Sequence, residues 1–340
     1  MLLVAKDALN RLIARNDLTR EEMLGVMRQI MGGEYTPAQI AGVLVALRMK
    51  GETVDEITAA AEVMRELSTK VKLAADEHLI DTCGTGGDGI QTFNVSTVSA
   101  FVAAAAGASV AKHGGRSVSS TCGSADVLEA LGVNISLTPD QVATCIEAAG
   151  IGFMFAPSHH SAMRHAAPVR RELGVRTLFN LLGPLTNPAG AGNQVMGVFD
   201  KHLTGKLAHV LKQLGSRHVM VVHGADGMDE ISFAGDTYVA ELKDGVISEY
   251  VINPRQFGMP LHDAETIRVH DAAESKRLIQ AVLNGETGSA RDIVLLNAGA
   301  AIYVAGVEAS LEAGIMKAAQ VIDSGAARAK LAQLARLSNA

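Results

Sequence analysis

The stretch DTCGTGGDG, residues 81–89, decides the fold of this 340-residue chain. It continues a short apolar run, residues 78–83, that has the length of a β-strand. Glycines at the carboxyl end of a strand let backbone N–H groups approach a phosphate without interference from Cβ. No Gly-Lys-Ser/Thr follows, and the stretch fits the G-x-G-x-x-G pattern poorly, which excludes the two common nucleotide loops. The stretch therefore predicts an anion-binding loop at the ligand-binding edge of an α/β sheet.

The chain after this loop alternates strand-length apolar runs with helical stretches. The predicted strands are residues 78–83, 109–113, 152–156, 195–199, 218–223 and 292–297. This alternation predicts a mostly parallel sheet flanked by helices. Two further runs, residues 237–242 and 247–252, flank Lys243-Asp244-Gly245 and predict a hairpin. The segment 158–182 is helical and polar, and it interrupts the sheet pattern.

The residues before the loop predict helices only. Three helix starts carry a threonine followed three residues later by Glu or Gln: Thr19-x-x-Glu22, Thr36-x-x-Gln39 and Thr53-x-x-Glu56. Gly32-Gly33 and Gly51 supply matching stops. We expect a smaller all-α N-terminal domain, residues 1–72 together with part of 158–185, and an α/β domain spanning 73–340.

Composition narrows the class of protein. A hydrophobic content of 48% suits a large packed core, and a net charge of −6 disfavours nucleic acid as a partner. The cysteines Cys83, Cys122 and Cys145 form no C-x-x-C pair, which indicates buried thiols rather than disulfides or a zinc site. The most apolar stretch, residues 98–111, is shorter than the roughly 20 residues of a membrane span. With no signal-peptide pattern either, we expect a cytoplasmic protein without membrane partners.

Two further segments suit anion binding. Asn94-Val-Ser-Thr97 precedes an Ala-rich helical run, as at a helix N-terminus aimed at an anion, although plain N-capping by Ser96 or Thr97 would explain one of these residues. Lys112-His-Gly-Gly-Arg-Ser117 follows another predicted strand and continues through hydroxyl residues to Ser124. The alternative for that segment is a solvated surface loop.

An acidic pair follows the predicted strand 218–223. Asp229 and Glu230 offer hard oxygen ligands on a glycine-containing loop, as suits Mg²⁺ that already carries phosphate oxygens. Acidic pairs on loops are common, so this signal gains weight only in combination with the others.

In combination, these motifs resemble those of the anthranilate phosphoribosyltransferase family, in family order and over nearly the whole chain. The matching stretches are residues 84–88, 94–97, 112–114, 123–132, 180–188 and 229–230. The resemblance implies a helical domain on an α/β domain, the fold shared with nucleoside phosphorylases, and a homodimer formed through the helical domains. It implies transfer of the phosphoribosyl group of phosphoribosyl pyrophosphate (PRPP) to the amine of anthranilate, in tryptophan biosynthesis, with hinge closure of the active site.

The resemblance also implies site residues. Mg²⁺, two ions per subunit, would bind Ser96, Asp229 and Glu230. Anthranilate would contact Gly84, His113, Gly115, His160, Arg170 and Pro184, with Arg170 rather than Arg171 at its carboxylate; for His113, His160 and Pro184 a packing role is an equally good interpretation. PRPP would contact Gly84, Gly87, Asp88, Thr92, Asn94, Val95, Ser96, Thr97, Lys112, His113, Gly114, Gly115, Arg116, Ser117, Val118, Ser119, Ser120 and Ser124. No dedicated acid or base is expected, because an aryl amine is already a nucleophile.

One residue departs from the family pattern. Gly115 stands where the family loop has an asparagine that contacts anthranilate. It is the one feature that favours a nucleic-acid-binding, non-enzymatic relative of the same fold, and the negative charge opposes that alternative. A pyrimidine nucleoside phosphorylase is the second alternative, opposed by Asp229-Glu230 and by the 94–97 motif.

Overall fold

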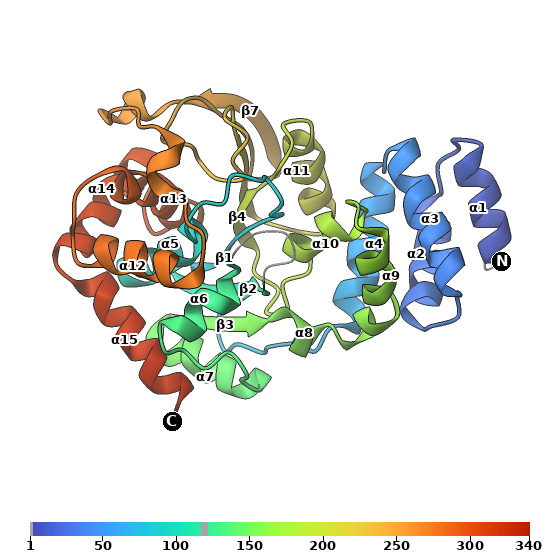
Figure 1. Cartoon of the computed structure of the whole chain (residues 1–340), viewed down its shortest axis with the longest axis horizontal. Helices are drawn as coiled ribbons and strands as arrows, with labels where there is room; N and C mark the ends of the chain where they lie inside the picture. The colour runs from blue at the N-terminus through green and yellow to red at the C-terminus, as the bar shows by residue number, and fades with distance from the viewer. Residues whose placement is uncertain (1–2, 117–121) are drawn as a thin grey trace.

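The computed structural model describes residues 3–116 and 122–340. The N-terminal helices form one end of the molecule (Figure 1) and carry the three predicted capping boxes, in which Thr19, Thr36 and Thr53 accept hydrogen bonds from backbone N–H groups three residues on. Gly32 and Gly51 follow the last residues of two of these helices, as predicted. The helices are α1 (Ala5–Ile13), α2 (Arg20–Met31), α3 (Pro37–Lys50) and α4 (Val54–Leu67).

The rest of the chain builds a seven-stranded sheet of order β3-β2-β1-β4-β5-β6-β7. Strands β1 to β5 pair in parallel, and β6 and β7 form the predicted antiparallel hairpin at one edge. The mostly parallel sheet is therefore confirmed. The strands are β1 (Leu79–Gly84), β2 (Ser109–Gly114), β3 (Ile151–Phe155), β4 (Asn193–Gly197), β5 (His218–Gly224), β6 (Thr237–Lys243) and β7 (Val246–Ile252).

Helices cover both faces of this sheet. Alternate residues of β5 enter different cores: Val219 and Val221 pack toward the N-terminal helices and α11, whereas Met220 and Val222 pack toward the C-terminal helices. The covering elements after the N-terminal bundle are α5 (Val95–Ala106), α6 (Ser124–Ala130), α7 (Pro139–Ala149), α11 (Leu203–Gln213), η2 (Pro254–Phe257), η3 (Ala264–Ile267), α12 (Ala272–Leu283), α13 (Ser289–Val304), α14 (Leu311–Asp323) and α15 (Ala326–Ser338).

The predicted strand at 292–297 is wrong, because these residues lie inside helix α13. A short apolar run does not distinguish a buried strand from a buried helix. The run continues through the small residues Ala298, Gly299, Ala300 and Ala301, and every residue from 293 to 302 is buried. A helix buried on all sides shows no polar face from which its period could be recognised.

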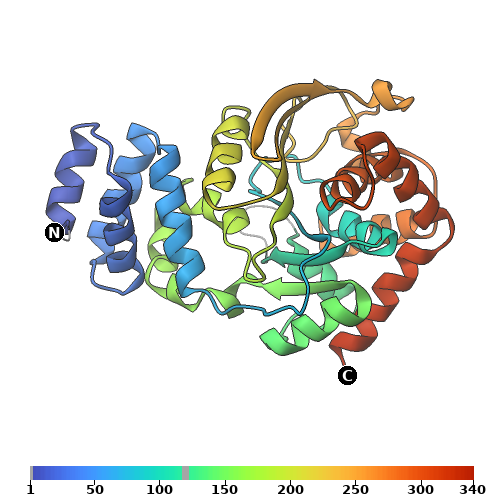
Figure 2. The same ribbon diagram turned by 180° about the vertical axis from the view of Figure 1, so that it is seen from behind.

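The segment 158–185 is helical and lies beside the N-terminal bundle, as Figures 1 and 2 both show. Its elements are α8 (Ala156–His159), η1 (Ser161–His165), α9 (Ala167–Leu173) and α10 (Phe179–Leu185). The polar character expected of it does not extend to α10, where Leu181, Leu182 and Leu185 are buried against the bundle. The chain therefore passes between the bundle and the sheet three times: after α4, from β3 into this segment, and from α10 back to β4.

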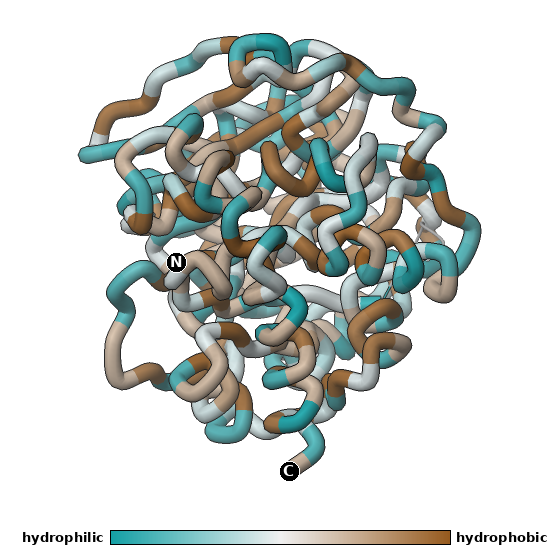
Figure 3. Tube along the Cα trace, turned by 90° about the vertical axis from the view of Figure 1, so that its left-hand side faces the viewer, coloured by the Kyte–Doolittle hydropathy of each residue, from teal (hydrophilic) through white to brown (hydrophobic). Residues whose placement is uncertain are grey.

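Hydropathy along the chain follows the layers. Seen from the side opposite the bundle, hydrophilic and hydrophobic residues alternate along the helices that face the viewer (Figure 3), as expected of helices buried on one face only. No helix in the described parts of the chain combines the length and apolarity needed to cross a membrane. All three cysteines are free; Cys122 and Cys145 are buried and Cys83 is partly so.

Candidate active site

The Gly-rich loop after β1 lies against the acidic segment that follows β5. A Cβ at Gly84 would stand 2.3 Å from a carboxylate oxygen of Asp229, so the close approach needs glycine. The N–H of Gly86 donates to the same carboxylate at 2.8 Å, and Gly86 has a φ of 65°. The loop thus presents its backbone to a carboxylate that lies 143 residues away in sequence. Of the other predicted loop residues, Asp88 accepts from the N–H of Ile90 and Thr92 forms an isolated bridge with Arg268.

The N-terminus of helix α5 faces the other carboxylate of the acidic pair. The N–H of Ser96 donates to Oε1 of Glu230 at 3.2 Å. Asn94 occupies the N-cap position without capping the helix by its side chain. That side chain accepts from the hydroxyl of Ser275 at 2.7 Å and donates to the carbonyl of Cys122 at 3.1 Å. Ser96 and Thr97 both lie within the helix, so the alternative that one of them is the N-cap residue is wrong.

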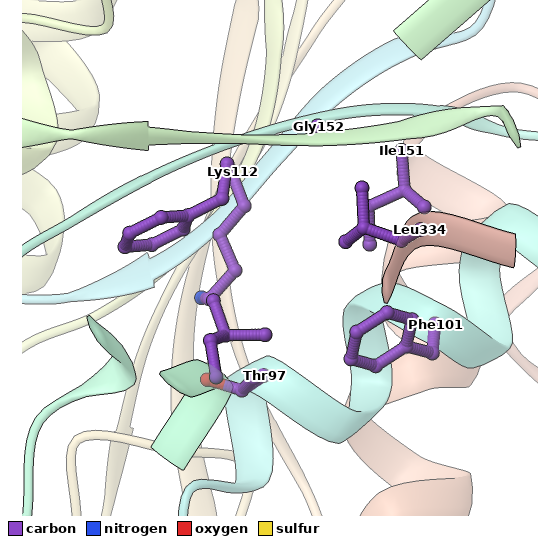
Figure 4. Close-up of a pocket in the computed structure, with 8 residues that line it drawn as sticks. Thr97, Phe101, Lys112, Ile151, Gly152 and Leu334 are labelled. Carbon is purple, nitrogen blue, oxygen red and sulfur yellow. The ribbon is translucent and has the colours of Figure 1, made fainter. Parts of the chain in front are cut away.

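Lys112 brings a buried cation to the same place. Figure 4 shows its aliphatic chain running from β2 along an apolar pocket toward Thr97 on α5. The ammonium group donates to the carbonyl of Thr82 at 2.5 Å and to the hydroxyl of Ser96 at 3.2 Å. Burial lowers the pKa of Lys112, and the nearby carboxylates, Asp81 first, act in the opposite direction. The lysine ammonium therefore lies next to the first turn of α5, where an anion bound at this helix N-terminus would be located.

The acidic pair is poorly compensated within the protein. Loss of solvent raises the pKa of Asp229 to about 7, and repulsion from Asp88 adds to the effect. Loss of solvent followed by repulsion from Asp229 also raises the pKa of Glu230 well above its usual range. Crowded carboxylates of this kind fit a divalent cation. In the described part of the chain no three His, Cys, Asp or Glu side chains form a complete metal cluster, so an ion here needs further oxygens, as Mg²⁺ takes from water, hydroxyls and phosphates.

The loop after β2 is only partly within the described residues. The hydroxyl of Ser124 approaches the Gly115 carbonyl at 3.5 Å, and a Cβ at Gly115 would meet none of the described atoms within 4 Å. Arg116 turns away from the glycine loop, because its guanidinium pairs with Asp126 at 2.8 Å and with Glu129 at 2.6 Å. The predicted phosphate contacts at Ser117, Val118, Ser119 and Ser120 lie outside the described residues.

Arg170 on α9 is half-buried, and its guanidinium lies 5.3 Å from the centre of the Phe179 ring. Burial lowers its pKa. Among the described residues no carboxylate pairs with Arg170, whereas its neighbour Arg171 is exposed. A partly desolvated guanidinium without a counter-ion suits a carboxylate ligand.

Two of the predicted histidines meet between the sheet and α10. The rings of His113 and His160 lie 5.0 Å apart between centres. Burial, followed by the neighbouring histidines, lowers the pKa of His113 to about 3 and that of His160 to about 4, so both are neutral at pH 7. Pro184 is buried within α10. The structure therefore brings the two histidines together.

Three supporting residues escaped the sequence analysis. Asn187 donates to Asp81 at 2.8 Å and to the Ala111 carbonyl at 2.9 Å, tying β1 to β2. Arg176 donates to the Gly87 carbonyl and stacks over Phe199, 4.1 Å from the ring centre. Asn297 binds the backbone beside Glu230. Asn187 lies within the quoted 180–188 motif, but for Arg176 and Asn297 the sequence carried no signal.

Comparison with known proteins places the chain in a class. Residues 6–68 match the helical bundle domain, and residues 76–328 the a/b domain, of the glycosyl transferase family. The site and these matches define a glycosyl transferase with a helical and an α/β part. The chain belongs to the anthranilate phosphoribosyltransferase family: it is 66% identical to the enzyme of that name from Methylobacillus flagellatus over the full length of both chains.

Solved structures agree with this assignment. The anthranilate phosphoribosyltransferase of Thermus thermophilus superposes with a TM-score of 0.93 at 44% identity, over 98% of this chain and 100% of that one. The Saccharomyces cerevisiae enzyme in complex with PRPP and Mg superposes with a TM-score of 0.84 at 26% identity, over 99% and 94% of the two chains.

Proposed function

We propose that this protein transfers the phosphoribosyl group of PRPP to the amine of anthranilate, giving N-(5-phosphoribosyl)anthranilate and pyrophosphate. The observation that carries the proposal is the convergence of Asp229, Glu230 and Lys112 on the Gly-rich loop and the N-terminus of α5. Backbone N–H groups, a lysine and a cation site at one sheet edge are what a pyrophosphate requires.

The residues of the chain then have separate tasks. Negative charge develops on the departing pyrophosphate, and the Lys112 ammonium and the α5 N-terminus lie where they stabilise it. Mg²⁺, held by Ser96, Asp229, Glu230 and phosphate oxygens, supplies additional neutralisation of the leaving group when bound. The amine attacks C1 of the ribose, the bond from C1 to the pyrophosphate oxygen breaks, and the amine loses a proton. Positioning of the two substrates supplies much of the rate, so no strong base is needed.

The anthranilate side of the site follows from the unpaired guanidinium of Arg170. It would bind the substrate carboxylate through two parallel hydrogen bonds. Neutral His113 and His160, with Pro184 and the backbone at Gly84 and Gly115, would form the walls of this subsite. The backbone N–H and C=O at Gly115 remain available where the family has an asparagine.

The remaining parts of the proposal are finer. PRPP contacts run from Gly84 to Thr97 and from Lys112 to Ser124, with Arg116 turning inward from its present ion pairs when substrate binds. We infer two Mg²⁺ ions per subunit, a homodimer formed through the helical bundle, a cytoplasmic protein, and a domain boundary near residue 72. The membership in the family supports each of these.

The test is the loss of anthranilate fluorescence on mixing the purified protein with PRPP and Mg²⁺, with product identified by mass. A parallel reaction with uridine and phosphate tests nucleoside phosphorylase activity, and a gel shift with single-stranded DNA tests nucleic-acid binding. Of the three tests, we expect only the reaction with anthranilate, PRPP and Mg²⁺ to give a positive result. Phosphorolysis of uridine, or DNA binding without turnover, would contradict the proposal.

A further inference from the structure

The segment that carries the acidic pair lies outside the strands, since residues 229–232 are in no helix or strand. A hydrogen bond joins it to the sheet, from the N–H of Ser232 to Oγ1 of Thr237 on β6 at 2.9 Å. Closer to Glu230, a side chain of α13 binds the backbone: the N–H of Ile231 donates to Oδ1 of Asn297 at 2.9 Å, and Nδ2 of Asn297 donates to the Ile231 carbonyl at 3.0 Å. Two hydrogen bonds of opposite sense to one residue fix the position and the rotation of the backbone directly after Glu230.

Asn297 is itself held rigidly. It is 2% exposed, and its Nδ2 also donates to the Ile293 carbonyl one turn earlier, at 2.9 Å. Helix α13 packs closely on α14: a Cβ at Gly299 would stand 2.7 Å from the backbone nitrogen of Ile315. The amide therefore ties the Glu230 segment to a platform in the core of the α/β domain.

Glu230 needs such a support. Glu230 and Asn297 line one small pocket together with Ser96. Within the described part of the chain, the one hydrogen bond to the Glu230 carboxylate comes from the N–H of Ser96 at 3.2 Å. Asp229 and Asp88 repel this carboxylate, and Lys112 attracts it. Without the Asn297 amide, the backbone N–H and C=O of Ile231 would lose both of these hydrogen bonds directly beside the crowded carboxylates.

We propose that Asn297 is a positioning residue that holds Glu230 in the orientation required to bind Mg²⁺ together with PRPP. The inference rests on the proposed function. An amide suits the task, because it offers one acceptor and two donors, and all three are used here. An apolar side chain offers neither a donor nor an acceptor, and an aspartate, which has nearly the same shape, has no hydrogen to donate to the Ile231 carbonyl.

The test compares Asn297→Ala with Asn193→Ala. Asn193 is 7% exposed and donates to the Leu79 carbonyl at 2.9 Å, at the opposite end of the sheet. Both variants lose buried hydrogen bonds and should unfold at lower temperature. Only Asn297→Ala should weaken PRPP binding in the presence of Mg²⁺, by about 10- to 100-fold in calorimetric titrations, as for other residues that orient metal ligands. The anthranilate KM should stay within about twofold in both variants, since neither residue is near Arg170.

Equal PRPP and Mg²⁺ affinities in the two variants would overturn the inference. Asn297→Thr is close in volume and cannot make both hydrogen bonds to Ile231, and the same comparison with it decides the question should the alanine variant not fold. Turnover by the unmodified protein distinguishes a failure of the inference about Asn297 from a failure of the proposed function. An active parent with an unaffected Asn297 variant contradicts only the role of Asn297, whereas an inactive parent contradicts the proposed function itself.

Discussion

Two groups of partly buried ionisable side chains lie at opposite ends of the sheet. At the amino end of β5, Glu241 accepts hydrogen bonds from His218 at 2.8 Å, from Tyr250 at 2.7 Å and from Tyr303 at 2.8 Å. Burial alone raises the pKa of a carboxyl group, but these bonds outweigh it and lower the pKa of Glu241 to about 2. Within the protein this carboxylate is fully compensated.

At the carboxyl end the same residue types are in the opposite situation. Asp229 and Glu230 have few donors of their own, and their pKa values are raised. A compensated carboxylate contributes to the stability of the fold, whereas an uncompensated one costs free energy that a cation or a ligand recovers on binding. The contrast teaches that loss of solvent alone does not mark a functional carboxylate; a shortage of internal hydrogen-bond donors and cations does.

The largest difference in turnover is expected between two variants, each of which loses one carboxylate at one end of the sheet. Glu230→Ala and the more conservative Glu230→Gln should lower Mg²⁺-dependent turnover by about 100-fold or more, with little loss of thermal stability. Glu241→Gln is the matched control and should keep its turnover per folded molecule. Undiminished activity of the Glu230 variants at limiting Mg²⁺ would remove the distinction between the two clusters.

A second contrast is between adjacent arginines. Arg170→Ala should raise the KM for anthranilate on the order of 100-fold and leave the KM for PRPP nearly unchanged, because only the half-buried guanidinium can bind the substrate carboxylate. Arg171→Ala is the control, since that side chain is exposed. Steady-state kinetics with each substrate varied in turn decide the matter. The assignment is wrong if the Arg171 variant shows the KM effect instead.

A smaller effect is expected at Gly115. The position has no positive φ, and a Cβ there would meet no described atom within 4 Å, so Gly115→Asn should fold normally. One neutral hydrogen bond contributes about 0.5–1.5 kcal/mol, so the anthranilate KM should change by no more than roughly tenfold. An inactive parent that gains turnover only on this substitution would favour the non-enzymatic relative.

The smallest effect on activity is expected from Glu241→Gln. This variant should instead lose stability, and the loss should depend on pH. The pKa of Glu241 is about 2 in the folded protein, below its ordinary value of 4.5, so its stabilising contribution is present above about pH 4.5 and is lost as pH falls toward 2. Glu241→Gln should cost about 2 kcal/mol of unfolding free energy at pH 7 and progressively less below pH 4.5. Urea midpoints of parent and variant over this range test it; a difference that is constant with pH contradicts the role of the charge.

Much of this architecture was predictable because it depends on local signals. The capping boxes at Thr19, Thr36 and Thr53 depend on neighbours three residues away, and the glycine loops follow strands directly. The buried helix α13 was mistaken for a strand, because a helix without a polar face has no readable period. The fold class therefore followed from sequence, and one element of it did not.

The supporting contacts of the site were not predictable. Asn297 meets Ile231 from 66 residues away, and Arg176 meets Gly87 from 89 residues away. Neither residue stands in a motif, and such pairings depend on tertiary packing. Arg116 illustrates the converse. It stands in the predicted loop, but its guanidinium forms ion pairs with Asp126 and Glu129, both on α6.

The most direct test of the central claim is the affinity of the protein for PRPP with and without Mg²⁺, measured by calorimetry on the parent, Glu230→Gln and Glu241→Gln. Carboxylates with few internal partners should make the binding of PRPP depend strongly on the cation. We predict that Mg²⁺ tightens PRPP binding by about tenfold or more in the parent and in Glu241→Gln, and by much less in Glu230→Gln. Equal responses to Mg²⁺ in all three proteins would contradict the claim that the carboxyl end of the sheet is built for a cation and the amino end is not.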